Sequence, residues 1–270
     1  DTILVRTTER DITHRRCEVE FVESCGDMGT IAVQEKLVKI NHLVPAEFPP
    51  AVLEQVESLV PEPSEEDMAG RRDLRDLPFV TIDGDTAKDF DDAVEVERLG
   101  EGQFLLRVAI ADVSHYVRTG SPMDREAQDR GNSWYFPTSV EPMLPKELSN
   151  GLCSLNPGVN RLVMWAEVPF DAGGRPGKAA FGTGVIRSFG RLTYDGVRDV
   201  VLLHDAVAED RFRETVREPA RVLAMLGDAF ELYRILREAR IRRGSLDFDL
   251  PETEAVFDEK GHVLNLFRAE

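Results

Sequence analysis

The chain has 270 residues, of which 50 are acidic and 33 basic, so that its net charge is −17. This length can bury a substantial core, and one large domain with a small appendage is the expected organisation. The acidic balance argues against a protein that coats nucleic acid with a basic surface, because neutralising phosphates supplies much of that affinity. It does not exclude an enzyme that gathers its positive charge inside a narrow channel.

The cysteines and the apolar runs set two further limits. Cys17, Cys25 and Cys153 are unevenly spaced and form no Cys-x-x-Cys pair, which argues against a disulfide framework or a zinc site and fits a reducing compartment. No apolar run is long enough to span a bilayer, and the first residues do not resemble a signal peptide. We therefore expect a cytoplasmic protein without a membrane segment, and a monomer.

The first 60 residues predict a small, β-rich N-terminal domain. Apolar and polar residues alternate in 17–22 and again in 30–34, a pattern typical of short strands around a turn. Pro50 can then open a helix that continues to Val60. Residues 61–76 begin with Pro, Ser and acidic side chains and predict an exposed linker.

Strands and helices are mixed in the rest of the chain, without a repeat. Residues 104–113 form an apolar strand whose hairpin partner is expected at 93–96. Ser and Pro at 121–122 open a helix that should end near Gly131 and deliver residues 134–137 onto a loop. Two long strands and one long helix are expected at residues 161–170, 179–194 and 222–239. This order predicts a mixed α/β domain of the α+β kind.

Five aspartates follow the apolar run 79–82 directly: Asp83, Asp85, Asp89, Asp91 and Asp92. Carboxylates this close repel one another unless they are solvated or neutralised by cations. Hard oxygen ligands suit Mg²⁺ or Mn²⁺, and no imidazole or thiolate lies near them in the sequence. The segment therefore predicts a site for Mg²⁺, with Mn²⁺ as the other candidate ion.

Other interpretations of this segment compete with the Mg²⁺ site. An EF-hand loop counted from Asp83 fails, because its last three required positions hold Ala, Lys and Val. A phosphatase with Asp83 as nucleophile and Asp85 as acid would need further acidic and Lys motifs downstream, which are not found. A solvated acidic turn is less favoured, because Phe90 and the apolar residues after it indicate partial burial.

Residues 77–270 resemble a known catalytic domain. The runs TIDGDTAKDFDDAV, VAIADVSHYV, RLTYDGV and RGSLDFDLPE occur here in the order in which similar motifs occur in the ribonuclease II/RNase R family. The resemblance implies a mixed sheet wrapped by helices around an RNA channel. It also implies a hydrolytic, Mg²⁺-dependent 3′→5′ exoribonuclease that acts processively on single-stranded RNA and releases nucleoside 5′-monophosphates. The alternative is a catalytically silent RNA-binding relative or fragment that keeps the aspartates.

The resemblance also suggests roles for individual residues. It places Asp83, Asp89 and Asp92 at metal-ligand positions and Asp91 at the position most critical for catalysis. Asp85 lies outside the motif set and is interpreted as a turn residue, since Asp and Gly are common in turns.

Three aromatic residues are assigned to RNA binding in the same way. Tyr135 and Phe248 match a pair that clamps the 3′-terminal bases, and Tyr194 matches a third aromatic near the scissile bond. The alternative for each is core packing, a serious one for Phe248 because its neighbours alternate like a half-buried strand. His115 and His204 have no partner pattern and are interpreted as structural or surface residues.

The family pattern extends beyond the residues present here. The family carries OB-fold RNA-binding modules upstream, so RNA binding is the candidate role of residues 1–60. Downstream it has a further Glu and an Arg that stabilises the transition state, and neither motif occurs before Glu270. We therefore expect 77–270 to be the N-terminal part of a catalytic domain that is truncated on its C-terminal side.

Overall fold

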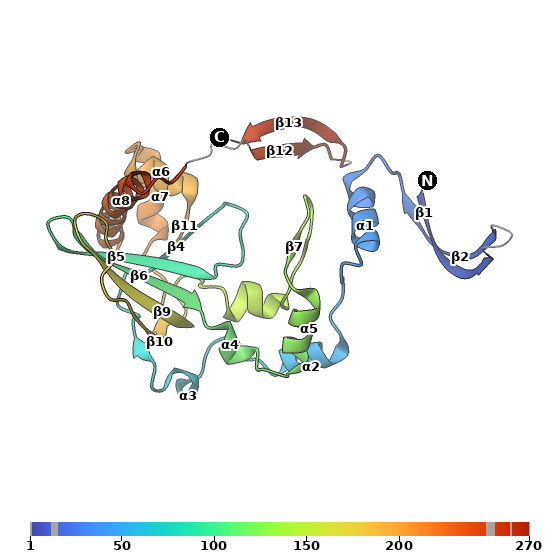
Figure 1. Cartoon of the computed structure of the whole chain (residues 1–270), viewed down its shortest axis with the longest axis horizontal. Helices are drawn as coiled ribbons and strands as arrows, with labels where there is room; N and C mark the ends of the chain where they lie inside the picture. The colour runs from blue at the N-terminus through green and yellow to red at the C-terminus, as the bar shows by residue number, and fades with distance from the viewer. Residues whose placement is uncertain (1, 12–15, 247–251, 260, 270) are drawn as a thin grey trace. The chain divides into compact units, whose positions relative to one another are not determined.

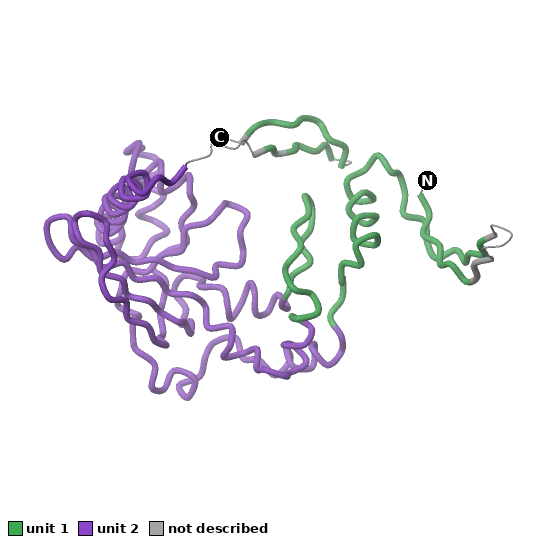
Figure 2. The backbone as a smooth tube through the Cα atoms, viewed as in Figure 1, with its two compact units in different colours: residues 1–48, 127–143, 248–270 green, residues 49–126, 144–247 purple. Residues whose placement is uncertain are grey.

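The structure is a computed structural model, which describes residues 2–11, 16–246, 252–259 and 261–269. The chain divides into two compact units, drawn in different colours in Figure 2. The smaller unit comprises residues 1–48, 127–143 and 248–270, and the larger one comprises residues 49–126 and 144–247. The predicted division into residues 1–60, a linker at 61–76 and a catalytic remainder stays a prediction. In the described residues, no helix is both long and apolar enough to cross a membrane.

A mixed sheet forms the centre of the larger unit, and it contains seven strands in the described residues (Figure 1). Its order is β11-β4-β5-β6-β9-β10-β3. The strands are β3 (Arg72–Asp73), β4 (Val80–Asp83), β5 (Asp92–Gly100), β6 (Gln103–Ala111), β9 (Arg161–Phe170), β10 (Ala180–Ile186) and β11 (Gly190–Thr193). The two outermost pairs, β11 with β4 and β10 with β3, are parallel, and the other pairs are antiparallel. The predicted mixed fold is confirmed.

Eight helical segments are described between residues 50 and 242. They are α2 (Pro50–Glu57), α3 (Glu65–Met68), α4 (Val113–Tyr116), α5 (Pro122–Arg130), a π-helix (Glu147–Leu152), α6 (Tyr194–Val201), α7 (Ala206–Thr215) and α8 (Pro219–Arg242). The last three pack on β4, β5 and β6 through a cluster of apolar side chains that includes Phe104, Phe189 and Leu226. Figure 1 shows these helices together at one end of the sheet. Burial of this apolar area is the main term that stabilises the unit.

Long periodic segments fold as the sequence predicts. Strands β5 and β6 form the expected hairpin, in register from Asp92 opposite Ile110 onward. Helix α5 begins after Ser121, whose hydroxyl accepts a bond from the Asp124 amide (3.1 Å). It ends at Gly131, which has a positive φ of 74° and is favoured there because it lacks a Cβ. Helix α8 spans the predicted residues 222–239.

Shorter segments differ from the predictions. The strand expected at 179–194 is two strands, because Phe189 leaves the sheet and is buried in the core. The predicted loop at 134–137 contains β7 (Trp134–Tyr135), which pairs with β8 (Val140–Glu141). The predicted linker contains α3, which begins at a capping box formed by Ser64 and Asp67. On α8, Phe230 and Tyr233 are exposed and stack on each other, although their spacing indicates core.

The smaller unit begins with an antiparallel pair, β1 (Thr2–Asp11) and β2 (Arg16–Gly26), and β2 contains the strand predicted at 17–22. Another antiparallel pair, β12 (Glu252–Phe257) and β13 (Val263–Ala269), belongs to the same unit. The strand expected at 30–34 is wrong, because those residues lie in α1 (Ile31–Asn41). Val33, Leu37 and Ile40 have helical spacing and turn inward, and a window of five residues is too short to separate that spacing from alternation.

Polar contacts join α1 to the β7–β8 hairpin. Glu35, which is almost fully buried, accepts hydrogen bonds from the amide and hydroxyl of Thr138 (2.7 and 2.9 Å). Lys39 forms an ion pair with Glu141 (2.6 Å). Because a buried carboxylate needs such donors, these contacts fix the hairpin on the helix. The hairpin therefore holds a defined position within its own unit.

The ring of Trp165 on β9 leaves no room for a side chain at Gly182 on β10. Its indole nitrogen donates to the Thr183 carbonyl (3.1 Å), and the Arg72 guanidinium lies 4.7 Å from its ring centre. A Cβ added to Gly182 would lie 2.7 Å from a ring carbon of Trp165. Real contacts are not that short, so the ring or the strand would have to move.

We predict that Gly182→Ala lowers the free energy of unfolding by about 1–3 kcal/mol, the usual cost of overpacking. Gly227→Ala is the matched control, because Gly227 lies inside α8 and its added Cβ would meet no atom within 4 Å. That control should stabilise the protein by about 1 kcal/mol through helix propensity. Urea unfolding followed by circular dichroism measures both. Equal effects of the two changes would contradict the packing argument.

Candidate functional site

Asp83 ends β4, the strand that lies between β11 and β5. Val80 and Thr81 of that strand are fully buried, so the apolar run before the aspartates is an inner strand that carries Asp83 to the edge of the core. Strand β11 runs parallel to β4, and Thr193 is the register partner of Asp83. Sites that bind ligands are common where neighbouring parallel strands end.

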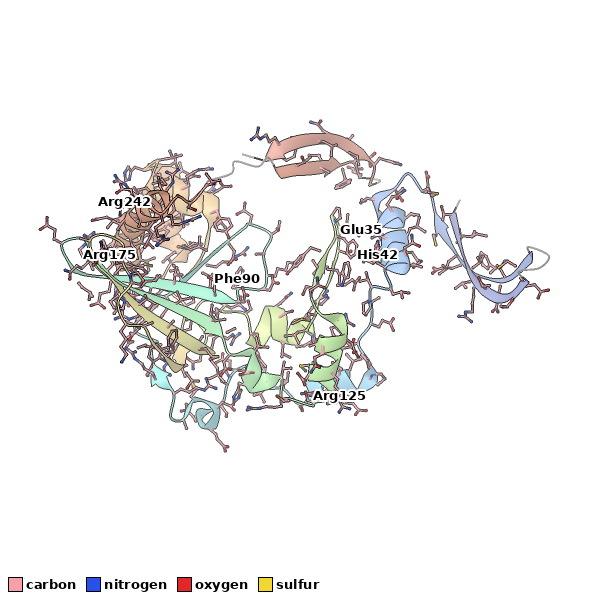
Figure 3. The ribbon with its side chains drawn as sticks, viewed as in Figure 1. Glu35, His42, Phe90, Arg125, Arg175 and Arg242 are labelled. Carbon is pink, nitrogen blue, oxygen red and sulfur yellow. The ribbon has the colours of Figure 1, made fainter. Side chains whose placement is uncertain are left out.

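The remaining aspartates lie on or just after the loop of residues 84–91, which joins β4 to β5. Its first part is a turn in which the Ala87 amide donates to the Gly84 carbonyl (3.1 Å). Asp85 is exposed in this turn, which confirms its interpretation as a turn residue. Phe90, marked in Figure 3, is 3% exposed and anchors the second part in the core. The predicted partial burial of the segment is confirmed.

The carboxylates lie close enough to influence one another's ionisation. Burial raises the pKa of Asp83 most, and the charges of Asp92, Asp91 and Asp89 raise it further. The pKa of Asp92 is also raised, by desolvation first and then by Asp91. The residue surface of Asp92 is exposed, so its desolvation comes from atoms packed around the carboxyl group. The chain thus concentrates negative charge at the end of β4.

The chemistry of this donor set fits a divalent cation. The Oδ2 atom of Asp83 is buried and has no hydrogen-bond partner. An ionised oxygen in that position is costly unless a cation or a donor meets it. In the described residues, no three His, Cys, Asp or Glu side chains converge into a group that could hold a metal ion. The backbone places the aspartates near one another along the chain without joining three carboxylates into one ligand group. The predicted roles of Asp83, Asp89 and Asp92 as metal ligands stay predictions.

Two of the three aromatic residues are exposed. Tyr194 is 65% exposed and opens α6 directly after Thr193, the register partner of Asp83. Tyr135 is 67% exposed on β7 in the smaller unit. Core packing is therefore the wrong explanation for both rings. Phe248 lies outside the described residues, so its predicted role stays a prediction.

The two singled-out histidines are structural or surface residues, as predicted. His115 on α4 hydrogen-bonds to Asp67 (2.9 Å), next to a buried ion pair between Arg71 and Asp112 (2.7 Å). His204 is exposed and has a positive φ of 50°. In the part of the chain that the structure describes, no hydrogen bond joins either ring to residues 83–92.

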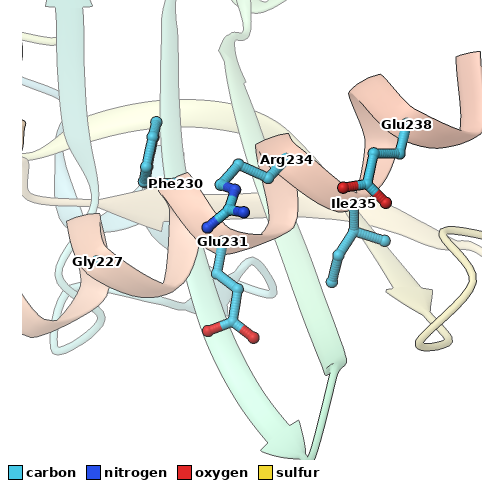
Figure 4. Close-up of a pocket in the computed structure, with 6 residues that line it drawn as sticks. All are labelled: Gly227, Phe230, Glu231, Arg234, Ile235 and Glu238. Atoms are coloured by element: carbon cyan, nitrogen blue, oxygen red, sulfur yellow. The ribbon is translucent and has the colours of Figure 1, made fainter. Parts of the chain in front are cut away.

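A surface pocket on α8 contains none of the predicted site residues. It is lined by Gly227, Phe230, Glu231, Arg234, Ile235 and Glu238, all from that helix (Figure 4). Because every described lining residue belongs to one helix, the pocket offers a ligand side chains from a single element. The aspartate loop remains the candidate site.

Sequence reasoning missed the residues that hold the aspartate loop. Ser154 contacts Phe90 and Lys88, and Arg191 contacts the turn that contains Asp85. These partners are 64 to 106 residues apart in the chain. Neither spacing nor composition relates such distant positions, and only the pairing of strands and loops in the fold brings them together.

Comparisons with known proteins show the family of the chain. A family model described as RNB domain matches residues 71–270. The chain is 41% identical over 263 residues to ribonuclease R of Vibrio parahaemolyticus and 42% identical over 262 residues to that of Escherichia coli. These alignments cover 97% of the chain and 30% and 31% of the two relatives. The chain thus spans about a third of the length of these relatives.

Solved structures show the same similarity. The apo form of Mycoplasma genitalium RNase R is 33% identical, with a TM-score of 0.86 over 99% of this chain and 40% of that one. The same enzyme solved with double-stranded RNA gives the same TM-score. Yeast Ssd1, described as a pseudonuclease, is 18% identical with a TM-score of 0.64, a likeness that concerns the fold alone.

The raised pKa of Asp83 predicts a stability effect. A carboxyl group whose pKa is higher in the folded than in the unfolded state destabilises the fold above its unfolded pKa, and the penalty disappears as the pH falls through the folded pKa. Asp83→Asn should therefore raise the urea midpoint at pH 7 in the presence of a chelator. The gain should shrink towards pH 4.

Asp85→Asn is the control for this experiment, because Asp85 is an exposed turn residue in the same loop and is not among the charges that raise the pKa of Asp83. Its midpoint should change little at either pH. A fall in the midpoint of Asp83→Asn at pH 7 would show that the carboxylate has a stabilising partner and would contradict the electrostatic description.

Proposed function

Because the chain belongs to the RNB domain family, we propose that it carries the metal-binding part of a hydrolytic 3′→5′ exoribonuclease that acts on single-stranded RNA. The observation that carries this proposal is the aspartate loop at the end of β4, where the buried Asp83 oxygen has no partner and neighbouring carboxylates add negative charge. Nucleoside 5′-monophosphates are the proposed products. A cytoplasmic monomer is part of the same proposal.

The aspartates have distinct roles in the proposed reaction. Asp83, Asp89 and Asp92 would hold Mg²⁺, or Mn²⁺ in its place. The bound ion would supply charge neutralisation at the phosphate and a more acidic water. Asp91, which is exposed beside Asp92, would orient the attacking water by accepting a hydrogen bond from it. All four act at one end of a rigid strand, which favours an accurate approach to phosphorus.

Base stacking would hold the substrate without reading its sequence. Each stack on an aromatic ring is worth ~1–3 kcal/mol, and every base has a face that can stack. The exposed rings of Tyr135 and Tyr194 are available for this, and Phe248 is the third proposed contact. RNA as the ligand is supported by Mycoplasma genitalium RNase R, solved with double-stranded RNA and with ribose-methylated single-stranded RNA.

A silent RNA-binding relative is the less favoured alternative. Its support would be the likeness to yeast Ssd1, but that protein shares 18% identity with the chain, which establishes the fold and no activity. The ribonuclease R relatives share 41–42%, and the aspartate set of the family motif is intact in this sequence. We therefore advance one function.

Asp91→Asn should abolish hydrolysis and leave RNA binding nearly unchanged. We expect the rate on 5′-labelled poly(A) with Mg²⁺ to fall on the order of a hundredfold or more, because an oriented carboxylate is lost from the site. Stacking and phosphate contacts would persist, so the affinity for single-stranded RNA should stay within about twofold. The test uses the complete gene product that contains this chain.

The control for Asp91→Asn is Asp85→Asn, which removes one charge from the same loop at an exposed turn position and should keep ordinary activity. If Asp91→Asn keeps ordinary turnover, the assignment of Asp91 is wrong. If the unmodified protein releases no nucleotides from labelled RNA, the proposed nuclease itself is wrong.

Tyr135→Ala should change where digestion stops more than it changes the chemical step. Weaker stacking releases short products earlier, so the limit oligonucleotides seen on a gel should become longer. Tyr135→Phe keeps the ring and should give the original ladder. An unchanged ladder together with a sharply lower melting temperature would instead make Tyr135 a structural residue of the smaller unit.

A further inference from the structure

Ser154 holds one side of the loop of residues 84–91 by hydrogen bonds. The hydroxyl of Ser154 accepts a hydrogen bond from the Phe90 amide (3.1 Å) and donates one to the Lys88 carbonyl (3.1 Å). The next residue, Leu155, donates its amide to the Phe90 carbonyl (2.7 Å). Ser154 is fully buried, so these bonds are shielded from water and are costly to lose.

Ser154 is itself held in place by a buried cation. The Nε atom of Arg161 on β9 donates to the Ser154 carbonyl (2.8 Å), and its Nη1 donates to the Asn160 carbonyl (2.9 Å). Arg161 is 6% exposed. A guanidinium that bonds two carbonyls in a buried position has little freedom to move. Through Ser154 and Arg161, the loop is therefore connected to strand β9 of the central sheet.

Arg191 holds the opposite part of the loop. It lies on β11 and pairs in register with Thr81 of β4. Its Nη2 donates to the carbonyls of Asp85 (2.7 Å) and Ala87 (3.2 Å), and its guanidinium lies 5.0 Å from the ring centre of Phe90. Bonds from a charged donor are stronger than neutral ones. Arg191 thus connects the turn to β11, the strand that runs parallel to β4.

The hydrogen bonds from Ser154 and Arg191 oppose the repulsion between the carboxylates of the loop. Carboxylates gathered at the end of β4 repel one another, and a loop free to move would relieve that repulsion by spreading. Ser154 and Arg191 bond the backbone at residues 85, 87, 88 and 90, between and beside the aspartates. The hydrogen bonds described between these two side chains and the loop all involve backbone atoms and none of the loop's carboxylate groups.

We propose that Ser154 and Arg191 are positioning residues, which hold the backbone of residues 84–91 at the end of β4, where the aspartates would bind a divalent cation. This inference rests on the proposed function. Groups that orient metal ligands from outside typically change metal affinity or activity 10–100-fold when they are altered. The predicted signature is therefore a higher metal requirement, not simply a less stable protein.

Arg191→Lys and Ser154→Ala test the two sets of loop contacts separately. Lysine keeps the charge but lacks the planar fork that reaches two carbonyls while stacking on Phe90. The control for it is Arg217→Lys, because Arg217 is also exposed and stacks on a phenylalanine, Phe189, at 4.3 Å. The control for Ser154→Ala is Ser188→Ala, because Ser188 is equally buried and its hydroxyl donates to the Gly190 carbonyl (3.2 Å). No hydrogen bond described for these two controls reaches residues 84–91.

The measurements use the complete gene product that contains this chain. Mn²⁺ binding without RNA is followed by the electron paramagnetic resonance signal of the free ion, and hydrolysis of labelled poly(A) is measured over a range of Mg²⁺ concentrations. Ser154→Ala and Arg191→Lys should each raise the Kd for Mn²⁺ about tenfold and the half-maximal Mg²⁺ concentration by a similar factor. Saturating Mg²⁺ should restore most of the rate. The controls should change either value less than twofold.

The outcomes separate this inference from the proposed function. If the unmodified protein hydrolyses RNA while Arg191→Lys binds Mn²⁺ normally, the positioning role is wrong and the nuclease stands. If the controls lose as much Mn²⁺ affinity as Ser154→Ala and Arg191→Lys, the effect is general destabilisation and the inference is overturned. If the unmodified protein neither binds Mn²⁺ nor cleaves RNA, both are wrong. Should Ser154→Ala fail to fold, Arg191→Lys at an exposed position decides alone.

Discussion

The mutual repulsion of the carboxylates of Asp83, Asp89, Asp91 and Asp92 is the constraint on which the candidate site depends. An inner strand paired on both sides fixes the start of the loop, and β5 fixes its end. Phe90 is buried between them. Rigid supports of this kind are what a catalytic group needs, because a displacement of 1 Å can cost a large factor in rate. The sheet therefore stabilises an arrangement that its own charges oppose.

A second group of carboxylates on the same sheet is stabilised in another way. Arg107 donates to Glu95 (2.6 Å), Glu97 (2.6 Å) and Glu167 (2.8 Å) across three neighbouring strands. There Arg107 forms an ion pair with each of the three acids, and Arg72 adds a second cation at Glu167 (2.9 Å). At the aspartate loop, Arg191 gives its described hydrogen bonds to backbone carbonyls instead. The glutamates are thus paired with cationic side chains of the protein, whereas the described hydrogen bonds of Arg191 reach only the backbone of the aspartate loop.

Sequence reasoning succeeded where a signal is local and long. The β5–β6 hairpin and α8 each cover many residues of one periodicity, and the aspartates are contiguous enough to stand out as a group. It failed at 30–34, where five residues fit both alternation and a helix, and at 179–194, where the burial of Phe189 breaks one apolar run into two strands. The supports of the loop were invisible because they meet it only through tertiary pairing.

The two tryptophans of the chain fall one in each compact unit, Trp134 on β7 and Trp165 on β9. Trp165 lies under Arg72 and donates to a strand carbonyl, whereas the indole nitrogen of Trp134 is buried without a hydrogen-bond partner. Different surroundings give different emission, so a variant that keeps a single tryptophan reports by fluorescence on one unit alone. Denaturation curves that coincide for the two reporters would mean cooperative unfolding of the units, and separate curves would give each unit its own stability.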